Sequence, residues 1–363
     1  MKCERLWDLE YAKRPIPTFL PDISGWKELP ITGNEELLVP LGTFSTYKNA
    51  WKIPTTSIYA GQSKDSPYFG KAILGSEMVQ FAREQVVDEI MKVQAALPFG
   101  YHLIVYDAWR SLETQSSLYN FFYKELQQQN PSWDEEKLTK EAQRFVSLPS
   151  IDPKKPSPHN TGGSIDLAIL KLPEREEEAI LKIDEELERC DPENWRLIFL
   201  RQVERWGIMR RFGQVLEFGT EFDYAGPEAG VEYFETIKAQ SLSAKGESAL
   251  LNRRVLYHLM EEVGNHKAYK DEWWHYNSVR SQMGAKSAGL LSAEYGAIEL
   301  SEENILWAQT FRGFLDGFCR INKLNIGVNL RGISEYFEYV IRGVSLSGDP
   351  AETSLKKAAI ITP

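Results

Sequence analysis

Cysteine is scarce in this sequence, and the thiols it has are widely separated. Among the 363 residues there are three cysteines, Cys3, Cys190 and Cys319, and they form no CxxC pair. A cysteine zinc site or a redox dithiol requires closely spaced thiols, so neither is expected. A small, odd number of cysteines is typical of a reducing compartment, and we therefore predict a cytoplasmic protein.

Long apolar runs and a basic charge are also missing. No stretch of about 18 apolar residues occurs, so no transmembrane helix is predicted, and the N-terminal segment lacks the apolar core of a signal peptide. The formal net charge of −10 argues against a nucleic-acid partner. With 42% hydrophobic and 26% charged residues, the composition is that of a soluble globular chain. The sequence leaves the oligomeric state open.

The hydrophobic pattern changes between helical and strand periods along the chain, which predicts an α+β fold. Residues 1–70 favour loops and short strands. Helical character is expected over 75–97, 112–126, the highly charged 173–195, part of 201–224, 248–263 and 305–321. Short strands are expected over 101–109, 164–170 and 270–277, and a loose tail is expected at the C-terminus.

Two of the five histidines lie close to acidic residues. His159 stands in the run SPHNTGGSID, seven residues before Asp166, and His275 follows Glu272 by three residues in EWWH. Two imidazoles and a carboxylate can hold a catalytic zinc and leave one coordination position open for water. A further carboxylate that is not a ligand can accept the proton of that water. We therefore predict one Zn²⁺ per chain on His159, Asp166 and His275, with Glu272 as general base.

Each of these residues also has an ordinary structural explanation. Taken singly, His159 is a loop histidine, Asp166 a turn or cap residue, His275 a core histidine and Glu272 an exposed charge. These explanations lose force together, because the residues occur in order with a glycine-rich turn and a strand between them. No HExxH motif is present, which excludes the common zincin arrangement. If EWWH is a strand, its end must bend, since positions i and i+3 face opposite sides.

Four sequence blocks carry a resemblance to a known family. They are YDAWR, SPHNTGGSIDL, FGTEFDY, and NRRVLYHLMEE followed by EWWHY. The chain resembles the zinc D-Ala metallopeptidases that share a fold with the Hedgehog signalling domain, and it is most similar to D-alanyl-D-alanine dipeptidases of the vancomycin-resistance type. The resemblance covers roughly residues 40–280. It implies a small antiparallel sheet with flanking helices, and zinc-dependent hydrolysis of D-Ala-D-Ala, a cell-wall dipeptide, to two D-alanines.

The resemblance also implies roles for single residues. Arg110 resembles the family arginine that polarises the scissile carbonyl, as a permanently charged guanidinium can; the alternative is a structural salt bridge, with Asp107 as its partner. Asp223 resembles the aspartate that meets the free amine of the substrate, and Ser157 matches a serine beside the first ligand. Asp223, Ser157 and Asp107 are therefore the candidate substrate-binding residues.

The sequence departs from the family pattern at several points. Ser111 replaces the proline that usually follows the arginine, and a helical insertion is expected over about 171–215. We predict a metallopeptidase domain over 1–285 and a C-terminal extension over 286–363. Two other functions stay open: a D,D-carboxypeptidase or other murein peptidase of the same superfamily, and a non-catalytic binding module stabilised by zinc.

Overall fold

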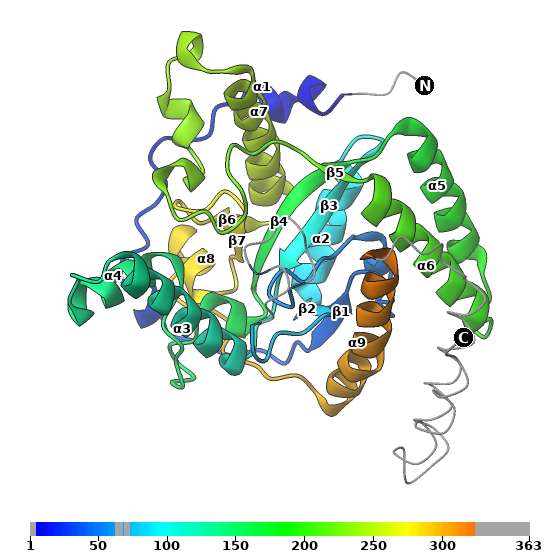
Figure 1. Cartoon of the computed structure of the whole chain (residues 1–363), viewed down its shortest axis with the longest axis horizontal. Coiled ribbons are helices and arrows are strands. Elements are labelled where there is room, and N and C mark those ends of the chain that lie inside the picture. The colour runs from blue at the N-terminus through cyan, green and yellow to red at the C-terminus, as the bar shows by residue number, and fades with distance from the viewer. Residues whose placement is uncertain (1–4, 62–67, 69–72, 324–363) are drawn as a thin grey trace.

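A computed structural model of the chain describes residues 5–61, 68 and 73–323, which form a mixed α+β structure (Figure 1). Its helices are α1 (Glu10–Lys13), α2 (Glu84–Ala96), α3 (Leu112–Gln129), α4 (Glu135–Phe145), α5 (Glu174–Arg189), α6 (Trp195–Phe212), α7 (Ala244–His258), α8 (Gln282–Ser287) and α9 (Glu302–Lys323). Its strands are β1 (Leu38–Leu41), β2 (Gln80–Arg83), β3 (Tyr101–Asp107), β4 (Ser164–Lys171), β5 (Gln214–Val215), β6 (His266–Ala268) and β7 (His275–Ser278).

The larger sheet has the order β3-β4-β7-β6, and the short strand β5 pairs with the end of β4. All of these pairings are antiparallel, which confirms the predicted small antiparallel sheet. Strand β4 lies between β3 and β7, and all its residues except the last are buried. A central strand covered on both faces is expected to be apolar almost throughout, as the SIDLAIL run is. The buried Asp166 within this run is therefore an exception that needs an explanation.

Strand register brings three candidate residues to one place on the sheet. Asp166 of β4 lies directly opposite His275 of β7. On its other side Asp166 lies opposite Asp107 of β3, beyond a register shift between Val105 and Asp107. A shift of this kind bends a strand and redirects its side chains. The pairing of distant segments therefore brings Asp107, Asp166 and His275 together on the sheet.

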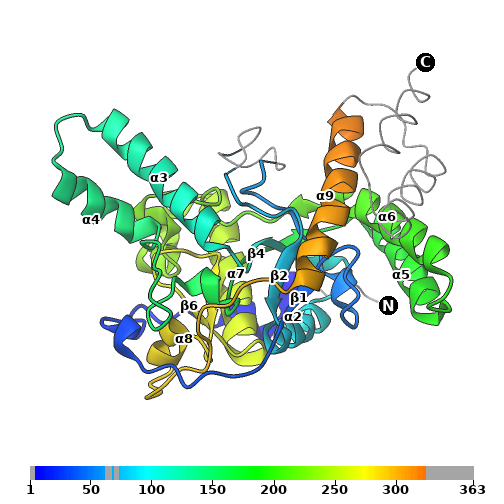
Figure 2. The same ribbon diagram turned by 90° about the horizontal axis from the view of Figure 1, so that it is seen from below.

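Two helical units lie at opposite ends of the molecule (Figures 1 and 2). The hairpin of α3 and α4 projects at one end, and both helices begin at side-chain caps, Ser111 and Asp134. The packed pair α5 and α6 lies at the other end, within residues 171–215, where a helical segment was predicted. This pair is joined to the sheet through a buried contact of 2.6 Å between His102 of β3 and Glu177 of α5.

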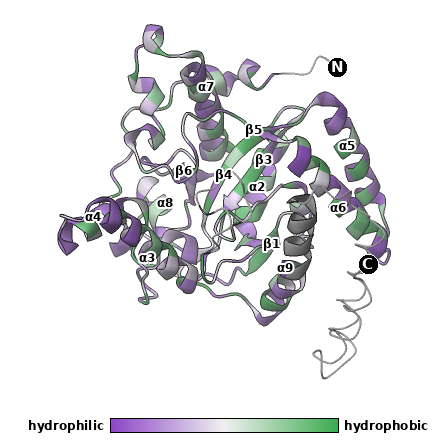
Figure 3. Ribbon diagram, viewed as in Figure 1, coloured by the Kyte–Doolittle hydropathy of each residue, from purple (hydrophilic) through white to green (hydrophobic). Residues whose placement is uncertain are grey.

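The principal core lies between the larger sheet and the helices α2 and α7. Figure 3 shows the predominantly hydrophobic colouring of β3 and β4 at the centre of the fold. Fully buried side chains from these elements include Leu103, Val105, Ile165, Leu167, Ile169, Val86, Val87, Ile90, Val255 and Leu256. Burial of such aliphatic side chains contributes about 1.5–3 kcal/mol each. The sheet that carries the candidate site is therefore rigidly supported.

Two predicted elements differ from the structure. Helix α2 begins only at Glu84, because Gln80–Arg83 forms a strand that pairs with Leu38–Leu41. Helical spacing of apolar residues before Glu84 was misleading, since a short strand buried on both faces has no helical or alternating pattern. The predicted strand over 270–277 was wrong for residues 270–274, because β7 begins at His275. The α4 helix was not predicted.

The described part of the C-terminal extension packs on the N-terminal half of the chain. Tyr295 is fully buried and donates to Glu36 at 2.8 Å, and the Asn304 amide donates to the Leu38 carbonyl at 2.7 Å. Helix α9 confirms the helix predicted over 305–321, while the predicted loose tail lies outside the described residues. Among the helices that the structure describes, none has the length and apolar character to cross a bilayer.

Candidate metal centre

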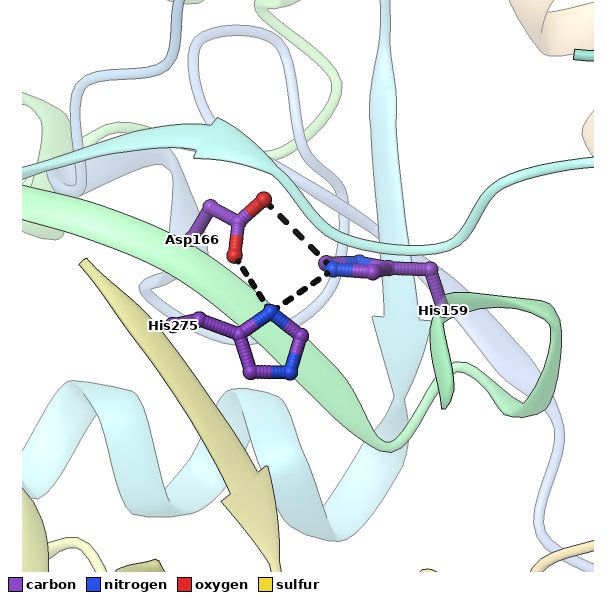
Figure 4. Close-up of side chains that lie close together, drawn as sticks. All are labelled: His159, Asp166 and His275. Carbon is purple, nitrogen blue, oxygen red and sulfur yellow. Dashed lines mark hydrogen bonds and ion pairs between the residues drawn. The ribbon is translucent and has the colours of Figure 1, made fainter. Parts of the chain in front are cut away.

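The side chains of the three predicted ligands point toward one another (Figure 4). All three line one cavity. His159 Nε2 lies 3.4 Å from Asp166 Oδ2, and His275 Nδ1 lies 3.0 Å from Asp166 Oδ1. The two ring nitrogens are 3.2 Å apart. His159, Asp166 and His275 are all buried, with 4%, 2% and 6% of their surface exposed. These three side chains can together hold a metal ion.

The loop before β4 brings His159 back to the sheet. His159 lies in a 3-10 turn, Pro158–Thr161, which ends at Gly162 with φ of +68°. This left-handed conformation favours glycine, and a Cβ at Gly162 would lie 2.5 Å from a methyl carbon of Leu38. The glycine therefore permits the sharp return that places the loop ligand over the strand ligand.

A second hydrogen bond orients each histidine ring. His159 Nδ1 lies 2.7 Å from the Ala108 carbonyl oxygen, and His275 Nε2 lies 3.1 Å from Asn277 Oδ1. In each ring the nitrogen that faces this oxygen donates its N–H to it, so the other nitrogen presents its lone pair to the common centre. Asn277 is itself held by the Ser164 hydroxyl, which donates to Oδ1 at 2.7 Å. Outer partners of this kind are usual around metal-binding histidines.

The donor set fits a cation. Asp166 Oδ1 is buried and makes no hydrogen bond, although a buried carboxylate oxygen is normally satisfied. Burial opposes ionisation of Asp166, but the imidazoles of His159 and His275 hold its pKa well below the usual range. Two facing lone pairs and an anion at this spacing repel one another unless a positive charge lies between them. A divalent metal ion held by the three side chains would supply that charge.

Glu272 lies beside the ligands without belonging to the strand. Its Oε2 is 3.6 Å from His275 Nδ1, and it occupies the turn that precedes β7. The turn is closed by backbone hydrogen bonds from Glu272 to Tyr269 and from His275 to Glu272. The chain therefore bends before His275, which is how the i,i+3 pair reaches the same centre. Burial, followed by the charges of Asp166 and Asp223, raises the pKa of Glu272 well above its usual value.

Arg110 is held in a fixed orientation at the edge of the cavity. Its Nε and one terminal nitrogen donate to Asp107 Oδ2 at 3.0 and 2.7 Å, and its other terminal nitrogen donates to Gln115 at 2.9 Å. The salt bridge with Asp107 that was considered as an alternative is therefore present. Asp107 Oδ2 also lies 3.2 Å from His159 Nδ1, so one oxygen contacts both Arg110 and a candidate ligand.

Asp223 faces the same cavity from the FGTEFD segment. Its backbone has φ of +60°, a left-handed conformation that is uncommon for a residue other than glycine. The Tyr59 hydroxyl donates to Asp223 Oδ2 at 3.1 Å. Burial, together with the negative charge of Asp166, raises the pKa of Asp223 to about 7. Ser157 is fully buried, and its hydroxyl donates to the Leu148 carbonyl at 3.0 Å.

The cavity has a volume of about 640 Å³. Six predicted site residues line it: Arg110, His159, Asp166, Asp223, Glu272 and His275. Tyr59, Tyr68 and Gln115 also line it and were not predicted. Asn277, which orients His275, was not predicted either, although a polar residue two positions after a ligand on a buried strand is a signal in the sequence.

Neither a scan against protein-family models nor a search of curated proteins found a match to this chain.

Proposed function

We propose that this protein is a zinc metallopeptidase that hydrolyses the dipeptide D-Ala-D-Ala to two D-alanines, on a fold of the Hedgehog-like D-Ala metallopeptidase type. One observation carries the proposal: three candidate ligands, a further carboxylate, a fixed arginine and a second acidic group face one cavity. A structural metal site needs ligands alone, whereas the additional groups are those that peptide hydrolysis requires. Their presence also argues against a non-catalytic binding module.

His159, Asp166 and His275 would hold the ion, which supplies a Lewis acid and lowers the pKa of a water at its open position. Glu272 accepts the proton of the attacking water and returns it to the nitrogen of the leaving amino acid. Arg110 donates to the oxygen of the scissile carbonyl as negative charge develops there.

The remaining predicted site residue in the cavity, Asp223, is assigned to the amino end of the substrate. Asp223 pairs with the free ammonium group of the dipeptide, because a buried carboxylate needs a cationic partner. Its partner is absent from an N-acylated peptide, so such a peptide leaves Asp223 uncompensated and binds weakly. We further propose a free dipeptide in the cytoplasm as the substrate, since the sparse cysteines suit a reducing compartment.

The D,D-carboxypeptidase is the second candidate function, and the cavity size favours it. Cavities of roughly 300–1,000 Å³ commonly hold ligands much larger than dialanine, and this one measures about 640 Å³. Asp223 favours the dipeptidase over this candidate, because a carboxypeptidase substrate has an acylated nitrogen at that position.

The deciding experiment measures bound metal and then kcat/KM for free and N-acetylated D-Ala-D-Ala. We expect one zinc per chain, with nitrogen and oxygen ligands in the X-ray absorption spectrum, and strong preference for the free dipeptide. Asp223→Asn should remove that preference. Equal rates on both peptides, unchanged in Asp223→Asn, favour the carboxypeptidase. Sulfur ligands, or no hydrolysis of either peptide by the zinc-loaded protein, contradict the peptidase proposal.

A further inference from the structure

The Tyr59 hydroxyl lies between the two groups that are proposed to hold opposite parts of the substrate. It accepts a hydrogen bond from a terminal nitrogen of Arg110 at 3.4 Å. It donates to Asp223, whose two carboxylate oxygens lie 3.1 and 3.5 Å away. Arg110 and Asp223 are far apart in sequence, and this single oxygen atom contacts both of them.

The position of that hydroxyl is well determined. Tyr59 is 4% exposed, and its ring lies under the guanidinium of Arg110 at 4.7 Å and against the rings of Tyr68 and Phe222 at 5.2 and 6.2 Å. The Tyr59 carbonyl accepts hydrogen bonds from the backbone of Ile73 and from the Ser76 hydroxyl. Both the ring and the backbone are therefore held, and the hydroxyl has little freedom to move.

The chemistry of a phenol suits this place. A hydroxyl has one proton and two lone pairs, so it can donate to a carboxylate while it accepts from a guanidinium. Burial and the nearby Asp223 charge raise the pKa of Tyr59 well above its ordinary value, so the proton stays on the oxygen. The hydroxyl therefore links Arg110 and Asp223 through one hydrogen bond that it accepts and one that it donates.

Asp223 needs such a restraint. Its left-handed backbone is costly for a residue with a Cβ, and strain of this kind persists only where surrounding contacts impose it. The Tyr68 hydroxyl also hydrogen-bonds Asp223, so two tyrosines hold the carboxylate. The Tyr59 hydroxyl also accepts a hydrogen bond from Arg110.

We propose that Tyr59 is a positioning residue that sets the separation between Arg110 and Asp223, so that the site accepts a peptide bond one residue from a free amine. This inference rests on the proposed peptidase function, since it assigns the ammonium group to Asp223 and the scissile carbonyl to Arg110. Tyr59 touches neither reacting atom. It acts by holding the Arg110 guanidinium and the Asp223 carboxylate at one distance from each other. Misplacement of such a group by about 1 Å can lower the rate by two orders of magnitude.

The test compares Tyr59→Phe with Tyr68→Phe, which removes the other hydroxyl at Asp223. Tyr68→Phe should raise KM for the free dipeptide and leave kcat nearly unchanged, because it removes a hydrogen bond to Asp223, which binds the ammonium group of the substrate. Tyr59→Phe should raise KM about tenfold and also lower kcat about tenfold. It removes the hydrogen bonds to both Asp223 and Arg110 while the ring stays in place. Equal constants in Tyr59→Phe and wild type, or the same pattern as Tyr68→Phe, overturn the proposal.

A binding measurement separates this inference from the proposed function. Calorimetry with a phosphinate analogue of dialanine, with the amine free or acetylated, requires no turnover. We expect wild type to prefer the free amine, and Tyr59→Phe to lose about tenfold of that preference. A wild type that shows the preference without hydrolysing any dipeptide contradicts the peptidase function alone. An undiminished preference in Tyr59→Phe contradicts the role of Tyr59 alone.

Folding of the variant is checked by its melting temperature and its metal content. Should Tyr59→Phe melt below wild type, the comparison uses 3-fluorotyrosine at position 59, which keeps the ring and the hydroxyl. Fluorine makes the hydroxyl a stronger donor to Asp223 and a weaker acceptor from Arg110. We expect kcat to fall with this substitution, and unchanged kcat and KM overturn the proposal.

Discussion

Two of the buried histidine–carboxylate pairs at the main sheet, His102–Glu177 and His275–Asp166, are built differently. In the pair His102–Glu177, the ring Nε2 and the carboxylate Oε2 are 2.6 Å apart and satisfy each other directly. In the pair His275–Asp166, Nδ1 and Oδ1 are 3.0 Å apart, yet Asp166 Oδ1 makes no hydrogen bond. The proton of His275 is directed elsewhere, to Asn277.

The comparison shows what separates a candidate metal centre from a structural contact. Both pairs are buried, so burial alone does not decide. At the centre a third ligand, His159, converges on the same point, and each ring has an acceptor on its outer nitrogen. Among the residues that the structure describes, His102 and Glu177 belong to no such group of three. The predictions below use the two neighbourhoods as matched tests of this difference.

The largest effect is expected when the same substitution is made at the two carboxylates beside histidines. Glu272→Gln should keep its zinc and lose about 10²–10⁴-fold in kcat, because an amide cannot accept the water's proton. Glu177→Gln should leave kcat unchanged, since its partner His102 lies away from the cavity lining. The measurements are steady-state kinetics and metal content by mass spectrometry. Loss of zinc from Glu272→Gln, with a normal rate per bound metal, contradicts its role as base.

The next effect concerns Arg110. Arg110→Lys should lower kcat/KM by about 10²-fold, as expected when one donor to a developing oxyanion is lost. A lysine cannot reproduce the planar contacts with Asp107 and Gln115, so its ammonium group will lie elsewhere. Zinc content should stay at one per chain. A rate close to wild type would show that the Arg110–Asp107 salt bridge is purely structural.

The ligand set could be predicted from the sequence because its signals are local. His159 and Asp166 are seven residues apart across a glycine turn, and Glu272 and His275 are three apart. The sheet joins these two segments by pairing β4 with β7, a contact between residues more than a hundred positions apart. Tyr59 could not be predicted, because it lies 164 positions from Asp223 and in an irregular segment. The Ala108 carbonyl that orients His159 belongs to the backbone and leaves no mark on the sequence.

The fold was predictable where the hydrophobic period is long and clear. Helix α3 and strands β3 and β4 have such periods and were expected close to their actual positions. Strand β2 was missed, because its four residues are all buried and its apolar positions coincide with a helical spacing. The bend at Glu272 depends on backbone hydrogen bonds of a turn, which residue types alone do not specify.

A smaller effect is expected from the acceptor that orients His275. Asn277→Ala should weaken zinc binding by about 10–100-fold, because the ring can then rotate and present the wrong nitrogen. Gln94→Ala is the matched control, since the Gln94 amide lies 3.5 Å from Nδ1 of His102 in the other neighbourhood. Competition against a chromophoric chelator gives both affinities. Equal zinc affinities in wild type and Asn277→Ala would mean that the sheet alone orients His275.

The smallest effect on function, and a clear effect on stability, is expected at the His102–Glu177 contact. Glu177→Gln replaces a buried carboxylate by an amide that keeps its shape, and a hydrogen bond to a charged group contributes about 1.5–3 kcal/mol. The loss should appear as a lower urea midpoint with an unchanged slope, because α5 is held to β3 by this contact.

Bound zinc raises stability by mass action, through its preference for the folded state. Within the part of the chain that the structure describes, Glu177 and the candidate ligands share no hydrogen-bond partner. The contributions of the Glu177 contact and of bound zinc to the free energy of unfolding should therefore add. The decrease in the free energy of unfolding caused by Glu177→Gln should therefore be the same with zinc bound and with zinc removed by chelator. A decrease that changes with zinc would show that the α5 contact and the metal centre are coupled, and that the two neighbourhoods are not independent.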